Sequence, residues 1–244
     1  MLVFRKRRDR NRSKKYYNFF MKILYYIHGC EYLFYGGLMR IPIINAKGGV
    51  TKTTSAIYLA LAASRNDQPV EVLDADVQGH ASLWAYAAED AGTPLPFPVA
   101  ITNIVNLERL KPDDSKWTII DAAPSGKIID VCIRIADYII IPTSDSPMDL
   151  QQVRAVMDII PPEKPCAVLV TRAQRNTRAF GQTVAMLDDT EHQGAQAMPR
   201  FETVIPMRQD IKRAMGSAPS KLYEYGDAYV ELKEDIARMK EGNR

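Results

Sequence analysis

The stretch IPIINAKGGVTKTTSAIYLALAA, residues 41–63, decides the fold of this protein. It begins with an apolar run, passes through a short segment with two glycines and two lysines, and ends in a run with the composition of a helix. In an open α/β sheet, the loop between the first strand and the first helix is the expected phosphate-binding position, because ligands bind at the carboxyl ends of the strands. The stretch therefore predicts a strand, a phosphate-binding loop and a helix.

The loop departs from the common phosphate-loop pattern GxxxxGK[ST], because Ala46 and Thr51 occupy its two glycine positions. Gly48 and Gly49 still allow the backbone to turn its N–H groups inward toward a phosphate. A glycine-rich turn that merely caps a helix is the structural alternative, but it gives no reason for two lysines in the loop.

The side chains that follow the turn suit a nucleoside triphosphate. Lys52 can reach the β and γ phosphates, Thr53 can place its hydroxyl on Mg²⁺, and Thr54 can contact the α phosphate. These residues predict a nucleotide site with Mg²⁺.

Beyond this stretch, short apolar runs alternate with helical patterns, which predicts a doubly wound, mostly parallel α/β sheet flanked by helices. The expected strands are residues 41–45, 69–73, 117–121, 138–142, 166–171 and 203–205. The expected helices are residues 52–65, 79–90, 126–136, 147–160, 177–189, 208–215 and 226–240. The proline-containing segment 91–98 is expected to be a surface connection.

Charge divides the chain into two parts. Residues 1–38 carry nine Lys and Arg against two acidic residues, a net +7, which leaves −4 for residues 39–244 from the total of +3. Binding of nucleic acid by the body would therefore need a local basic patch. The three cysteines are far apart and indicate neither a zinc site nor a disulfide framework.

The leader, residues 1–38, joins a basic block to an aromatic stretch that Lys22, His28 and Glu31 interrupt. These polar residues count against a secretory signal and against a membrane-spanning helix. An interfacial anchor or a nucleic-acid-binding arm remains open. Because Met39 stands where the first strand begins, we favour a disordered leader or a misassigned start codon, with one ATPase domain over residues 39–244.

The loop KGGVTKTT resembles the signature KGGxGK[ST]T of the ParA/MinD family of deviant Walker-A ATPases, and the resemblance extends over residues 39–244. It implies a P-loop NTPase fold, ATP and Mg²⁺ as cofactors, and weak hydrolysis unless stimulated. Lys47 matches the signature lysine, which reaches the nucleotide of a partner subunit, and Lys52 matches the general Walker lysine. Thr51 departs from the signature glycine.

Two further motifs fit this family. LDADVQ resembles its D-x-D-x-Q segment, which implies that Asp76 lies near the attacking water, with Asp74 and Gln78 in support. WTIID resembles the Walker-B strand, so Asp121 is expected to hold Mg²⁺ through a water, together with Thr53.

The resemblance also implies the remaining site residues. Pro206 and Arg208 are base-pocket candidates. The expected catalytic residues are Lys47, Lys52 and Asp76; the expected nucleotide-binding residues are Gly48, Gly49, Val50, Thr51, Lys52, Thr53, Thr54, Pro206 and Arg208; the candidate DNA-binding residues are Arg172, Arg175, Arg178, Lys212 and Arg213. The alternative for the basic residues is an ordinary solvated surface.

By this resemblance we expect a cytoplasmic, nucleoid-associated partition ATPase. It would form a homodimer with ATP, bind DNA nonspecifically and segregate plasmid or chromosomal DNA with a ParB-like centromere-binding protein. The alternative is a hydrolysis-impaired, ATP-gated scaffold or a MinD-like positioning protein. No membrane contact is expected, since Val230, Leu232, Ile236 and Met239 of the terminal helix suit packing better than a lipid-binding face.

The backbone at Thr51 decides how well the loop works. A positive φ would strain a β-branched residue by roughly 1 to 3 kcal/mol, whereas a near-helical φ would cost little. Because the other parts of the site are present, we expect the near-helical backbone.

Overall fold

The computed structural model describes residues 39–242, except residues 112, 114, 125 and 189–197. The leader, and with it the expectation for residues 1–38, lies outside the described residues. The same is true of the last residue of the helix expected at 177–189.

Six strands form one parallel sheet in the order β3-β2-β4-β1-β5-β6. Strands β1, β4 and β5 are buried along nearly their whole length, as expected of a parallel sheet that is covered on both faces. The prediction of a doubly wound α/β sheet is confirmed. The strands are β1 (Met39–Ile43), β2 (Val70–Ala75), β3 (Val99–Ile101), β4 (Trp117–Ala122), β5 (Ile139–Thr143) and β6 (Cys166–Val170).

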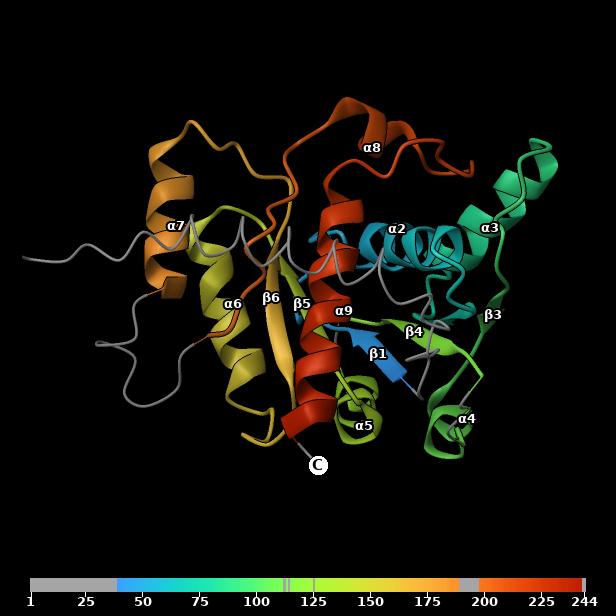
Figure 1. The fold of residues 1–244 in the computed structure, drawn as a ribbon, viewed down its shortest axis with the longest axis horizontal. Coiled ribbons are helices and arrows are strands. Elements are labelled where there is room, and N and C mark those ends of the chain that lie inside the picture. Colours follow the sequence, from blue (N-terminus) through green and yellow to red (C-terminus); the bar gives the residue numbers. More distant parts are fainter. Residues whose placement is uncertain (1–38, 112, 114, 125, 189–197, 243–244) are drawn as a thin grey trace, which may run out of the picture. The chain divides into compact units, whose positions relative to one another are not determined.

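Helices cover both faces of the sheet, and the sheet separates two hydrophobic cores (Figure 1). Buried side chains of α2, α3 and α9 form one core with one face of the sheet. Those of α4, α5, α6 and α7 form the second core with the other face. The helices are α2 (Lys52–Arg65), α3 (His80–Asp90), α4 (Ile104–Glu108), α5 (Lys127–Ile135), α6 (Pro147–Met157), α7 (Arg178–Asp188), α8 (Gln209–Arg213) and α9 (Glu224–Gly242).

The prediction of a strand at residues 203–205 was wrong. This segment runs beside β6, where the N–H of Ile205 donates to the oxygen of Val170 at 2.9 Å, but only isolated bridges form. Its backbone thus lies at the edge of the sheet without a regular ladder.

Two elements were not predicted. The edge strand β3 and the short helix α4 follow the 91–98 segment, which is itself partly internal, since Phe97 is buried. Strand β3 has three residues, too few for a periodic pattern to identify.

Helix α9 packs against α2 and crosses it at the centre of one face (Figure 1). Leu232 and Ile236 are buried and Met239 packs against the same core, as expected, whereas Val230 is half exposed. No helix among the described residues is both long and apolar enough to cross a bilayer.

Candidate nucleotide site

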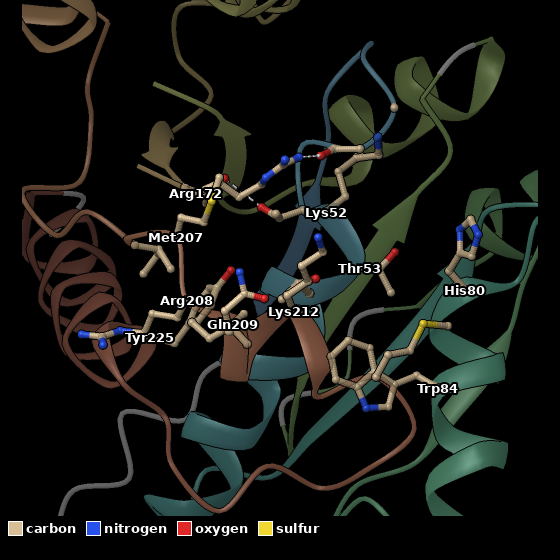
Figure 2. A pocket seen from close by; sticks show the side chains of 18 of the residues that line it. Lys52, Thr53, His80, Trp84, Arg172, Met207, Arg208, Gln209, Lys212 and Tyr225 are labelled. Atoms are coloured by element: carbon tan, nitrogen blue, oxygen red, sulfur yellow. Dashed lines mark hydrogen bonds between the residues drawn. The ribbon is translucent and has the colours of Figure 1, made fainter. Parts of the chain in front are cut away.

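The carboxyl ends of three neighbouring strands bring the predicted motifs together. Asp121 on β4 pairs in register with Ile43 of β1 on one side and with Asp74 of β2 on the other. The loop after β1 therefore lies next to both acidic motifs. A cavity of about 610 Å³ opens here, between the loop, α3, α8 and the start of α9 (Figure 2).

The phosphate loop, residues 46–51, is built on buried Asn45. The Asn45 side chain donates to the oxygen of Pro142 at 2.8 Å and accepts from the N–H of Lys47 at 2.8 Å. The loop then turns at Gly49, where φ is 75°, a conformation that glycine adopts without steric cost. The amide of Asn45 thus ties the start of the loop to β5.

Thr51 has φ 67° and ψ 25°, in the left-handed region. The expectation of a near-helical backbone was therefore wrong. A threonine here carries a strain of about 1–2 kcal/mol, because its Cβ crowds the neighbouring carbonyl. The geometry follows from position: Thr51 immediately precedes α2, and its oxygen accepts the first helical hydrogen bond, from Ser55 at 2.8 Å.

Lys52 extends its ammonium back over the loop. Its Nζ donates to the oxygen of Lys47 at 2.9 Å and to that of Asn45 at 3.3 Å. Burial lowers the pKa of Lys52, while the negative charges of Asp121 and Asp76 work to raise it. A buried cation at a glycine-containing turn favours a polyanionic ligand.

Thr53 lines the cavity, and its hydroxyl donates to Oδ2 of the buried Asp121 at 2.7 Å. Asp121 is 1% exposed, and within the described part of the chain its Oδ1 has no hydrogen-bond partner. Burial raises the pKa of Asp121 to about 7, despite the hydrogen bond from Thr53. A buried carboxylate with one unpartnered oxygen next to a hydroxyl is suited to a hard cation.

The acidic segment after β2 has two distinct carboxylates. Asp74 is fully buried and accepts from the N–H of Ser82 at 2.8 Å, which fixes the first turn of α3. Asp76 is half-buried, lines the cavity, and accepts from the N–H of Gln78 at 3.0 Å. Asp74 therefore holds the segment in place while Asp76 faces the space that a ligand would enter.

Lys47 forms an ion pair with Asp149 near the start of α6. The buried Asp149 carboxylate also accepts from the Ser144 hydroxyl at 2.6 Å. Although burial acts to raise the pKa of Asp149, the hydrogen bonds from Lys47 and Ser144 hold it below its usual value. Within this chain, Lys47 is thus engaged outside the cavity.

Of the two predicted base-pocket residues, Arg208 lies across the cavity from His80 and Trp84 of α3 (Figure 2). Pro206 lines the cavity. Arg208 also lines it, but its guanidinium binds Glu224 and lies 5.0 Å from the centre of the Tyr223 ring. The ion pair holds the charged end of Arg208 against α9. Val50, expected among the nucleotide-binding residues, is 2% exposed and does not line the cavity.

The basic residues proposed for DNA divide into two groups. Arg172 and Lys212 line the cavity. Arg175 donates to the oxygen of Val204 at 2.8 Å, and Arg178 and Arg213 are exposed on α7 and α8. DNA contact by these side chains stays a prediction.

Several lining residues were not predicted from the sequence, among them two on α3 and two in the segments around α8 and α9. His80 and Trp84 lie one turn apart on α3, and Trp84 Nε1 donates to the oxygen of Ser217 at 2.8 Å. Met215 and Tyr225 come from the segments around α8 and α9. The spacing of His80 and Trp84 directly after the D-x-D-x-Q segment was a signal for one helix face at the site.

Comparisons with known proteins agree with this geometry. The model of the CobQ/CobB/MinD/ParA nucleotide binding domain (CbiA) matches residues 41–219. Maintenance of carboxysome distribution protein A of Gloeobacter kilaueensis is 30% identical over 207 residues, which cover 82% of this chain and 92% of that protein.

Two solved structures share the fold. The ATP complex of a McdA variant of Cyanothece has a TM-score of 0.60 at 19% identity, covering 83% of this chain and 96% of that one. A plasmid partition protein of Borrelia burgdorferi has a TM-score of 0.56 at 18% identity, covering 81% and 99%. The family match over most of the chain, joined to the loop, strand and carboxylate geometry above, places this chain in the CobQ/CobB/MinD/ParA nucleotide-binding family, as a protein of the ParA/MinD type.

Proposed function

We propose that this chain is an ATPase of the ParA type that binds Mg-ATP, dimerises in the ATP state and positions a large cargo in the cell. The observation that carries the proposal is that Lys52, Thr53 and Asp76 line one cavity, with Asp121 bonded to Thr53 directly behind it. The relatives named above, one of them solved with ATP, support the same function.

The residues fit ATP and Mg²⁺. Lys52 and the N–H groups of the glycine turn are the donors for the phosphates. Thr53 and Asp121 supply oxygen ligands, the Asp121 oxygen directly or through a water, and Mg²⁺ usually takes one or two protein oxygens and keeps several waters. Bound Mg²⁺ would neutralise charge on the phosphates.

Hydrolysis needs a group that orients water, and Asp76 is the candidate. Its carboxylate lines the cavity and is held by Asp74 through the segment after β2, where the N–H of Asp76 donates to Asp74 Oδ1 at 3.3 Å. We infer that Asp76 accepts a hydrogen bond from the attacking water rather than binding the cation. Turnover is expected to be slow without a stimulating partner.

Dimerisation is assigned to Lys47. Its side chain is half exposed and does not line the cavity of its own chain. In the proposed dimer it leaves Asp149 and reaches the nucleotide of the second subunit. Exchange of one anionic partner for another would make the dimer depend on the bound triphosphate.

Two cargoes are proposed. The first is plasmid or chromosomal DNA, moved together with a ParB-like centromere-binding protein while the ATP dimer binds DNA nonspecifically, in a nucleoid-associated state. The second is a protein compartment, and the 30% identity to a carboxysome distribution protein favours it. A scaffold that dimerises with ATP but hardly hydrolyses it is the remaining alternative, since Thr51 strains the loop.

The test combines sedimentation velocity with an ATPase assay. We expect a dimer with Mg-ATP, a monomer with Mg-ADP, and phosphate release that rises with DNA and a partner protein. Asp76→Ala should bind ATP and dimerise yet hydrolyse it at least about tenfold more slowly, since general-base assistance contributes about 10²–10⁴-fold. Loss of ATP binding in Asp76→Ala would contradict the assigned role, and normal dimerisation without wild-type turnover would favour the scaffold.

A further inference from the structure

The phosphate loop is attached at two points to the end of β6. The Thr51 hydroxyl donates to Thr171 Oγ1 at 2.9 Å, and Arg172 Nη1 donates to the oxygen of Gly49 at 3.0 Å. Figure 2 shows Arg172 next to the loop, with this bond dashed. Two successive residues after one strand therefore hold two residues of the loop.

The Thr171 anchor is rigid. Thr171 and Thr143 are fully buried, and the oxygen of Thr143 accepts both the N–H of Thr171 at 2.7 Å and its hydroxyl at 3.0 Å. Because Thr171 donates its hydroxyl hydrogen to the oxygen of Thr143, the lone pairs of Thr171 Oγ1 are available to the Thr51 hydroxyl. The Thr51 hydroxyl also lies 2.5 Å from the oxygen of Val50, which shares the same donor.

The attachment coincides with unusual backbone. Thr51 and Arg172 both have positive φ, 67° and 52°. Side chains other than glycine rarely adopt this region, and such residues persist only where their surroundings hold them. A free threonine at position 51 would favour negative φ, which would redirect the peptide that leads into Lys52.

We propose that the Thr51 hydroxyl is a positioning group for the phosphate loop, and that its bond to Thr171 replaces the conformational freedom that glycine has at this position. The inference rests on the proposed nucleotide site. Without the bond, the loop spends less time in the binding conformation, and the apparent affinity for nucleotide falls in proportion to the population lost.

Substitutions at position 51 separate the effect of the hydroxyl on nucleotide binding from the effect of the backbone conformation. Thr51→Val keeps the β-branched shape and loses the donor, so binding of mant-ADP and Mg-ATP should weaken about 3- to 10-fold, the range of one net hydrogen bond. Thr51→Ser keeps the donor and should stay within about twofold of wild type. Thr51→Gly loses both bond and strain and should stay within about threefold.

The measurements are stopped-flow binding of mant-ADP and calorimetry with Mg-ATP. A loop that is less often competent lowers the apparent association rate, whereas a lost ligand contact raises the dissociation rate. We expect Thr51→Val to act on association. Thr171→Val should have a similar effect, and the double variant should be no weaker than either single one.

Thr143→Val is the matched control. It is an equally buried threonine on the neighbouring strand, and its Oγ1 has no hydrogen-bond partner within the described ranges, so affinity should not change. If the wild type binds nucleotide and both Thr51→Val and Thr171→Val bind it with the same affinity, the inference is overturned while the proposed function stands. Absence of nucleotide binding by the wild type would overturn the proposed function. If Thr51→Val does not fold, the Thr171→Val result decides.

Discussion

Replacing Asp149 by asparagine removes the negative charge that holds Lys47 and keeps the shape of the side chain. In the structure this carboxylate is buried and accepts hydrogen bonds from Lys47 and from Ser144. The hydroxyl bond from Ser144 becomes neutral in the variant, a loss of about 0.5–1 kcal/mol. The ion pair adds about 0.5–1 kcal/mol, because the Lys47 side chain is 47% exposed and its charge is screened by water.

Asp149→Asn should therefore unfold at lower urea concentration, with a loss of about 1–2 kcal/mol near pH 7. The pKa of Asp149 lies below its usual value in the folded protein. A depressed pKa contributes stability above the unfolded value of about 3.9, and that stability is lost as pH falls through the folded value. The gap between wild type and variant should thus narrow as pH falls below about 3.9 and through the lowered pKa of Asp149.

Urea denaturation followed by circular dichroism measures both quantities in the nucleotide-free protein. Lys47→Met is the matched variant, since it keeps the apolar stem and removes the cation. The two substitutions should be less than additive, because each breaks the same pair. An identical destabilisation by Asp149→Asn at neutral and acidic pH, or full additivity with Lys47→Met, would refute the reasoning.

Three further outcomes follow from the site. Lys52→Ala should weaken Mg-ATP binding beyond detection by calorimetry, because it removes the buried cation at the phosphates; near-normal affinity would contradict the site. Lys47→Ala should bind ATP about as well as wild type but fail to form the ATP dimer, and a normal ATP-dependent dimer in sedimentation would count against its role. Tyr225→Phe leaves the Ser55 hydroxyl without its 3.0 Å partner and should cost about 1 kcal/mol in urea denaturation, while unchanged stability would show that Ser55 finds another partner.

The sequence predicted those parts of the molecule whose place in the fold follows from a local pattern of residues. Short apolar runs identified five of the six strands, and the order of motifs predicted that Lys52, Thr53 and Asp121 lie around one point. Strand β3 escaped because a three-residue edge strand has no period and its neighbours decide its structure.

Contacts between segments that are distant in sequence could not be predicted from local patterns of residues. The ion pair between Lys47 and Asp149 joins residues 102 positions apart, and the left-handed backbone of Thr51 depends on its place before α2 and beside Thr171. A threonine in a glycine position suggested either a relaxed or a strained loop, and only the three-dimensional surroundings decide between them.

The contact between α9 and α2 has a consequence for synthesis of the chain. Tyr225 stacks on Tyr58 with ring centres 4.8 Å apart, bonds to Ser55, and lines the cavity. A nascent chain that has already completed its phosphate loop therefore still lacks one wall of the site until its last helix leaves the ribosome. Until then the part of α2 that packs against α9 has no cover, so a polypeptide truncated before residue 224 should be prone to aggregation and should be a client of chaperones rather than a smaller working enzyme.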